Sequence, residues 1–159
     1  MTKKTANLGL FCALAIILGY VESFIPLPIG IPGVKIGLAN LSVLYLLQTW
    51  SWREAAVVSL IRIIVIGFLF GNLFSILYSL SGAAFSLLVM TLLTADGRAS
   101  IPAVSILGGI AHNAAQLFVA VLLTHSIYLL SYAPVLLLSG VAAGALIGFL
   151  TKEVARRIR

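Results

Sequence analysis

AVSILGGIAHNAAQLFVAVLLT, the stretch Ala103–Thr124, is long and apolar enough to cross a membrane as a helix, which takes about 20 apolar residues. Its middle nevertheless carries His112 and Asn113, and Gln116 follows one turn later. Strongly polar groups at membrane depth are costly, so they face partners inside a protein or a water-filled cavity. The stretch therefore predicts a membrane-spanning helix with one polar face.

The rest of the chain has the same apolar character. Of its 159 residues, ten are Lys or Arg and four are Asp or Glu, while 62% are hydrophobic. The mean hydropathy is +1.19. A soluble domain of this length would need far more polar surface to cover its core. We therefore expect an integral membrane protein.

Six apolar runs are separated by segments rich in proline, glycine or charge, which end helices. The runs are Ala6–Ile25, Ile36–Thr49, Ala55–Phe70, Leu73–Leu93, Ala103–Thr124 and Ala133–Leu150. The second and third are short, so their ends could extend into the flanking loops. We expect an all-α membrane protein with six transmembrane helices, which form a single domain over residues 1–159.

The basic residues predict the orientation. With six spans, both termini and the loops after the second and fourth runs share one side of the membrane. That side collects Lys3, Lys4, Arg53, Arg98, Lys152, Arg156, Arg157 and Arg159, whereas the other side has only Lys35. The positive-inside rule then places both termini in the cytoplasm of a cell-membrane protein. The net charge of +6 also suits contact with anionic membrane lipid, and a nucleic-acid partner is not expected.

Motifs for catalysis and for metal binding are absent from the sequence. It has no GxxxxGK[ST] phosphate loop and no HExxH, and Cys12 is its only cysteine. The four acidic residues are unpaired, whereas magnesium-dependent diphosphate chemistry needs clustered carboxylates. We therefore expect no enzyme activity, no metal and no cofactor.

The expected topology places most of the unusual polar groups between the middle of the membrane and its outer face. Arg62, His112 and Asn113 fall near mid-depth, Asn40 lies in the outer third, and Lys35 lies at the outer mouth. The cytoplasmic half is almost purely apolar. This asymmetry predicts a polar cavity that opens outward.

Helical spacing supports one polar stripe on the fifth run. Separations of four, three and four residues align Ser105, Gly109, His112 and Gln116. Such a stripe suits either a ligand-lining surface or a lock of hydrogen bonds between helices, and both readings stay open. Glu22 fits either as the counter-ion of Arg62 or as a wall of the pocket.

Two small-residue motifs predict close approach of helix backbones. The ladder of Gly140, Gly144 and Gly148 on the last run favours packing within the chain. Gly9 and Ala13 form a GxxxA motif on the first run, where a partner subunit is an equally good neighbour.

Three segments carry a resemblance to a known family: PGVKIGLANL over 32–41, LYSLSGA over 77–83 and GGIAHNAAQ over 108–116. With them the chain resembles, over essentially its whole length, the Gx transporter family, which is also labelled heptaprenyl diphosphate synthase component I. That family looks like a relative of the S components of energy-coupling factor (ECF) transporters. The resemblance implies a six-helix protein that binds a small molecule near the outer face and docks on a coupling subunit with two ATPases.

The resemblance fits some features of the chain better than others. In S components a small-xxx-small face on the first helix contacts the coupling subunit, and Gly9 and Ala13 match it in part, since alanine is usual at both positions. The synthase label fits poorly, because prenyl synthases rely on aspartate-rich motifs and Asp96 is the only aspartate.

The leading expectation is a substrate-binding subunit for uptake of a small anionic or amphipathic molecule, energised by separate chains. The alternatives are a non-transporting partner of isoprenoid, quinone or flavin-linked redox machinery, and a structural assembly protein. The expected partner-binding residues are Gly9 and Ala13. The expected substrate-binding residues are Lys35, Asn40, Arg62, Asn72, Tyr78, His112, Asn113 and Gln116.

Overall fold

The computed structural model describes residues 3–25 and 36–158, and its described residues are all helical or in loops. Six α-helices and one short 3-10 helix follow one another along the chain. They are α1 (Lys3–Ser23), α2 (Asn40–Thr49), α3 (Trp52–Phe70), α4 (Leu73–Asp96), α5 (Ile101–Thr124), η1 (Ile127–Tyr132) and α6 (Ala133–Ile158). The all-α prediction is confirmed.

Local chemistry explains where the helices begin and end. Ser51, Asn72 and Ser100 precede α3, α4 and α5 in extended conformation, and each side chain accepts a backbone N–H of the first turn. Gly97 ends α4 in the left-handed conformation at φ 70°. The predicted bounds differ from these by up to eight residues, most at α6, because that helix continues into the polar segment after Leu150.

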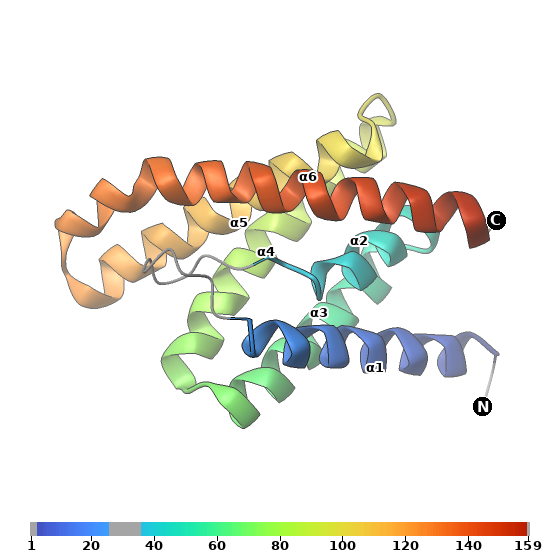
Figure 1. The fold of residues 1–159 in the computed structure, drawn as a ribbon, viewed down its shortest axis with the longest axis horizontal. Coiled ribbons are helices and arrows are strands. Elements are labelled where there is room, and N and C mark those ends of the chain that lie inside the picture. The colour runs from blue at the N-terminus through green and yellow to red at the C-terminus, as the bar shows by residue number, and fades with distance from the viewer. Residues whose placement is uncertain (1–2, 26–35, 159) are drawn as a thin grey trace.

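The helices run back and forth along the long axis of the molecule (Figure 1). The start of α1, the α2–α3 connection, the α4–α5 loop and the end of α6 lie toward the right of that view. The predicted basic side therefore corresponds to one end of the structure.

Four of the helices are long and apolar enough to cross a membrane: α1, α4, α5 and the continuous η1–α6 segment. The chain thus has the character of a multi-pass membrane protein. The other two differ from the predicted spans for physical reasons. α2 has ten residues, about 15 Å of helix, which is half the thickness of a bilayer core. α3 has 19 residues but carries Arg53, Glu54 and Arg62.

The short helix α2 lies in the core of the bundle. It contacts α1, α3, α4 and α6, and its residues from Ser42 to Leu47 are all buried. Leu44 and Leu46 pack there with Val58 of α3 and Val104 of α5. Large apolar side chains are instead exposed on the outer helices, among them Leu10, Phe68 and Leu138, as expected of surfaces that face lipid.

The glycine ladder of α6 packs against α5, which confirms the prediction of packing within the chain. A Cβ atom on Gly140 would lie 2.7 Å from the carbonyl oxygen of Gly109. One on Gly144 would lie 2.7 Å from the carbonyl oxygen of Ser105, and one on Gly148 would lie 2.6 Å from Cα of Pro102. Only glycine allows backbones this close, so the ladder fixes the position of α6 along α5.

A second set of contacts holds the start of α1. Lys4 Nζ lies 2.6 Å from a carboxylate oxygen of Glu54 and 5.9 Å from the ring centre of Trp50. Ser51 also donates a hydrogen bond to Glu54. These contacts tie α1 to the α2–α3 connection. We call Lys4, Trp50, Ser51 and Glu54 the N-terminal clamp.

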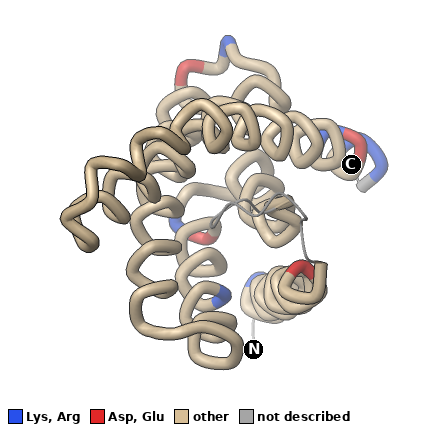
Figure 2. The backbone as a smooth tube through the Cα atoms, turned by 60° about the vertical axis from the view of Figure 1, so that its left-hand side comes forward, with Lys and Arg blue, Asp and Glu red and all other residues tan. Residues whose placement is uncertain are grey.

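Charged residues are sparse along the backbone (Figure 2). Among the described residues, they gather at the clamp, at the α4–α5 loop with Asp96 and Arg98, and near the end of α6, where Glu153 pairs with Arg156 and Arg157. Glu22 and Arg62 are the exceptions, because they lie away from these groups and line a cavity.

Candidate ligand-binding site

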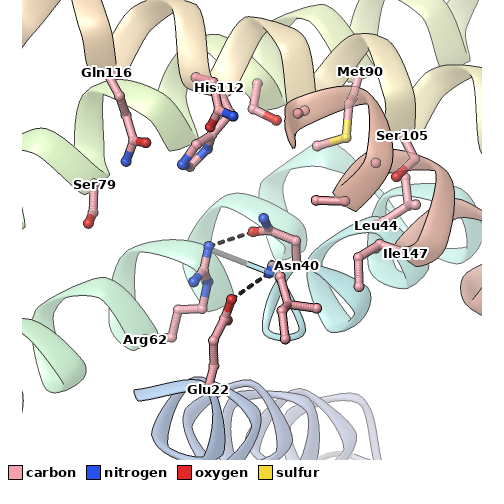
Figure 3. Close-up of a pocket in the computed structure, with 18 residues that line it drawn as sticks. Glu22, Asn40, Leu44, Arg62, Ser79, Met90, Ser105, His112, Gln116 and Ile147 are labelled. Carbon is pink, nitrogen blue, oxygen red and sulfur yellow. Dashed lines mark hydrogen bonds between the residues drawn. The ribbon is translucent and has the colours of Figure 1, made fainter. Parts of the chain in front are cut away.

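A partly open cavity of about 100 Å³ lies among the helices (Figure 3). Each of the six α-helices contributes to its lining. Since one water needs roughly 10–15 Å³ of such space, the cavity has room for several waters or a small polar molecule. The lining comprises Glu22, Ile36, Gly37, Asn40, Leu44, Arg62, Ser79, Ser86, Met90, Ser105, Gly109, His112, Asn113, Gln116, Gly140, Ala143, Gly144 and Ile147.

Arg62 brings a permanent positive charge to this cavity. Its Nη2 donates a 2.6 Å hydrogen bond to Oδ1 of Asn40 at the start of α2. Its Nε is buried and has no hydrogen-bond partner among the described residues. An unpaired buried donor is costly, and it is costlier still on a charged group. Since Nε itself is enclosed by protein, the charge of the guanidinium is what Arg62 contributes to the cavity that it lines.

Glu22 brings the opposite charge from the end of α1. Its carboxylate accepts a hydrogen bond from the backbone N–H of Gly37, just before α2. Gly37 adopts φ 81°, a conformation that suits glycine. Glu22 also interacts electrostatically with Arg62. The two readings of Glu22 left open by the sequence, counter-charge and cavity wall, thus hold together.

The polar face of α5 enters the cavity from the opposite side. His112 and Gln116 both line it, and Gln116 is only 5% exposed. Gly82 of α4 makes room for them, because a Cβ atom there would lie 2.8 Å from His112 Nε2 and from Gln116 Cγ. Ser79 faces the same space from α4 (Figure 3). The predicted stripe on α5 is thus directed inward.

Asn113 combines a cavity position with a helix lock. Its Nδ2 donates hydrogen bonds of 2.6 Å to the carbonyl oxygen of Leu136 and 3.1 Å to Oγ of Ser139, both on α6. The amide nitrogen is thereby committed to joining α5 and α6. The helix-lock reading therefore applies to Asn113, whereas a ligand-binding role of the α5 polar face stays a prediction.

Five of the eight expected substrate-binding residues line this one cavity: Asn40, Arg62, His112, Asn113 and Gln116. Two lie elsewhere. Asn72 caps α4, where its side chain accepts the Ser75 N–H. Tyr78 stacks on Phe74 with ring centres 6.2 Å apart and is not part of the cavity lining. Lys35 lies outside the described residues.

The sequence also left site residues unnamed. Ser79, Ser86 and Met90 of α4 line the cavity, and their separations of seven and four residues place them on one helix face, a signal that was not used. Glu22 was expected as a counter-ion or a pocket wall but was not among the substrate-binding residues.

A second cavity of about 180 Å³ adjoins the first. The two share Glu22, Arg62 and Ser79 as a common wall. The remaining lining comes from α1, α3, the α3–α4 loop and α4 and includes Gly19, Ile63, Ile66, Phe70 and Ser75. Space therefore exists on both sides of the two charged side chains.

The GxxxA face of α1 has no packing partner comparable to that of the α6 ladder. Gly9 and Ala13 are both exposed. A Cβ atom added to Gly9 would meet no described atom within 4 Å. This face is therefore open at the surface of the chain.

The chain matches a family model described as heptaprenyl diphosphate synthase component I over residues 11–154. The match includes every described residue that lines the main cavity. Neither a curated protein nor a solved structure matches the chain significantly.

Proposed function

The chain belongs to the family described as heptaprenyl diphosphate synthase component I, and we propose that it is a membrane-embedded subunit that binds a small molecule for uptake. The observation that carries this proposal is the cavity around Arg62. Its walls combine the charge of Arg62 with the side chains of His112, Gln116 and Glu22. A concave site with a few convergent polar groups is typical of small-molecule binding.

The proposed topology places all six α-helices in the membrane, including the two that are not among the four long apolar ones. In it, α2 is enclosed by its neighbours and crosses only part of the bilayer. Both termini lie in the cytoplasm of a cell-membrane protein, since the basic groups gather at the end of the structure that contains them. The cavity then opens away from the cytoplasm.

Transport would need partners, because the chain has no ATP-binding motif of its own. By analogy with the S components that the sequence resembles, a coupling subunit would contact the exposed Gly9–Ala13 face of α1, and ATPases on other chains would supply energy. The chain itself is then a binding subunit rather than an enzyme, without a metal or cofactor.

A second candidate function is favoured by the description of the family, which names a component of a diphosphate synthase. In that role the chain would be a non-transporting membrane partner of isoprenoid or quinone biosynthesis, or of flavin-linked electron transfer. An accessory role fits better than catalysis, because Asp96 is the only aspartate and lies at the end of α4.

Arg62→Leu and Gln116→Leu test the binding role directly. Each removes donors from the cavity and keeps an apolar side chain. Because hydrogen bonds to charged groups contribute about 1.5–3 kcal/mol, Arg62→Leu should weaken binding of a co-purified molecule by roughly tenfold or more. Ligand retention by native mass spectrometry and uptake by cells expressing the variants provide the readouts.

Thermal unfolding separates this role from a purely structural one. Interhelical hydrogen bonds in membranes contribute about 0.6 kcal/mol on average, so a folded variant with modest loss of thermal stability is expected. Leu138→Ala, at an exposed position, provides the control for the effect of a surface substitution on thermal stability. An Arg62→Leu protein that unfolds, while any remaining binding is unchanged, would show that Arg62 is only a structural counter-charge.

A further inference from the structure

Two opposite charges line the main cavity without forming an ion pair. Glu22 and Arg62 both face it, yet no ion pair within 4.0 Å joins them among the contacts of the described residues. Their hydrogen-bond partners among the described residues are neutral instead: the backbone N–H of Gly37 for Glu22 and the side-chain oxygen of Asn40 for Arg62. The cavity thus presents a separated positive and negative group.

Both groups retain bonding capacity. A carboxylate accepts about four hydrogen bonds, and Glu22 accepts one from the described residues, on Oε1. A guanidinium has five N–H donors, and the hydrogen bond from Arg62 to a described residue uses one of them, on Nη2. A molecule that carries both an acceptor and a donor can therefore use both charged groups.

The formal charges limit what a well-bound molecule can carry. The described ionisable residues that line the cavity are Glu22, Arg62 and His112, and their charges sum to zero when the imidazole is neutral. A simple anion would be attracted by Arg62 but repelled by Glu22. A simple cation would be attracted by Glu22 but repelled by Arg62. In the low dielectric of a membrane protein such repulsion is strong.

We propose that the cavity binds a small zwitterion, with its anionic group toward Arg62 and its cationic group toward Glu22. This rests on the proposed binding function and specifies the substrate class. The small volume of about 100 Å³ favours a compact molecule with the size of a small amino acid, whose ammonium group also donates hydrogen bonds. Ser79, which the two cavities share with the charged pair, and Gln116 provide uncharged hydrogen-bonding groups around it.

The experiment uses three probes that share a three-carbon skeleton. β-Alanine carries both charges, propionate carries the negative one alone, and propylamine carries the positive one alone. Dissociation constants are measured for the full-length protein in detergent after any co-purified molecule has been washed out. The wild type should bind β-alanine about tenfold or more tightly than either singly charged probe, because only β-alanine satisfies both charged groups.

Charge variants should change the preference in opposite directions. Glu22→Gln leaves the cavity with a net positive charge and keeps an oxygen that can accept the Gly37 N–H, so propionate should bind at least as tightly as β-alanine. Arg62→Gln should shift preference toward propylamine. Glu153→Gln is the matched control, since it removes the same charge from the distant end of α6 and should leave all three constants unchanged.

Thermal unfolding identifies any variant that fails to fold. If Arg62→Gln fails to fold, the comparison of the wild type with Glu22→Gln still tests the proposal. Equal or tighter binding of propionate by the wild type would overturn the zwitterion assignment while leaving the binding function intact. Failure of all three probes to bind the wild type would overturn it as well. The binding function fails separately, if native mass spectrometry finds no retained small molecule and the Arg62→Leu variant leaves uptake unchanged.

Discussion

At the residue scale, the site is organised by a charge that cannot be removed. Arginine stays protonated at all physiological pH values, so its neighbours must supply the polar surroundings that lipid lacks. Asn40 accepts a hydrogen bond from the Arg62 guanidinium, and Glu22 supplies a nearby negative charge. Arg62 also lines the cavity, so its charge is available to attract a bound molecule.

Gly82→Ala tests the shape of this site without removing a polar group. The new Cβ would lie 2.8 Å from His112 Nε2 and from Gln116 Cγ, so both side chains must move. Overpacking costs about 1–3 kcal/mol, and we expect a loss of stability at the low end, since side-chain ends can shift. The free energy of ligand binding should fall by more than the free energy of unfolding.

Gly9→Ala is the control, since the added atom meets no described atom within 4 Å. Helix propensity should then raise stability by about 0.5–1 kcal/mol. Thermal unfolding and a binding assay on both variants provide the measurements. Unchanged binding by Gly82→Ala would show that the positions of His112 and Gln116 do not matter to the ligand.

Several site residues were predictable from the sequence because charge and amide groups stand out in apolar helices. Arg62 and Gln116 are examples, and the structure brings them to one cavity. Asn72 shows the limit, since an Asn beside a helix start is as good a cap as a ligand. Serines are common on such helices, so Ser79 did not stand out by residue type, although it shares a helix face with Gly82 and Ser86. The bond between Glu22 and a backbone N–H depends on tertiary structure alone.

At the element scale, the helices differ in how firmly they are held. α5 and α6 meet through glycines, with backbone atoms in direct contact, and Asn113 adds hydrogen bonds between them. α1 has only Ala15 buried and depends on polar contacts near its two ends: the N-terminal clamp and the Glu22–Gly37 bond. The apolar runs predicted all six α-helices, four of which are long and apolar enough to cross a membrane. The ten-residue length of α2 was not predictable, because it depends on the neighbouring helices that enclose it.

The N-terminal clamp should respond to acid. The side chain of Lys4, followed by that of Ser51, lowers the pKa of Glu54 from 4.5 to about 2. A depressed pKa means that the clamp stabilises the fold fully above pH 4.5, the ordinary value, and loses this contribution as the pH falls toward about 2. The difference in melting temperature between wild type and Glu54→Gln should therefore shrink from pH 6 to pH 3, whereas a constant difference would contradict a charge-based clamp.

The exposed face of α1 predicts a partner contact. Gly9→Leu with Ala13→Leu fills this face and retains its hydrophobicity, so the protein should still insert and bind its ligand. If a coupling subunit docks there, uptake and co-purification with that subunit should both be lost. Leu138→Phe, on the lipid-exposed surface of α6, is the control for added bulk. Unchanged uptake by the double variant would assign the face to lipid contact.

At the scale of the whole molecule, the arrangement of the helices agrees with an even number of crossings. The start of α1 and the end of α6 lie at the same end of the bundle (Figure 1). The basic residues of the clamp, the α4–α5 loop and the α6 terminus also lie toward that end. This distribution predicts which side of the membrane each loop occupies.

Single-cysteine labelling tests that topology. In a Cys12→Ala background, Arg98→Cys should react with a membrane-impermeant reagent only in inverted vesicles, because the proposed topology places the α4–α5 loop in the cytoplasm. His125→Cys, which follows α5, should react only in intact cells. Reaction of Arg98→Cys in intact cells would overturn the orientation and with it the outward opening of the cavity.

The central claim is that the polar cavity around Arg62 holds a small molecule, and native mass spectrometry of the purified protein tests it most directly. The account predicts that the wild type carries an additional small mass, released by mild activation, and that Arg62→Leu and Gln116→Leu fold but lack it. Wild-type protein that shows only its own mass from several preparations, and that gains no stability from any added small molecule, would contradict the claim and leave the cluster as a lock between helices.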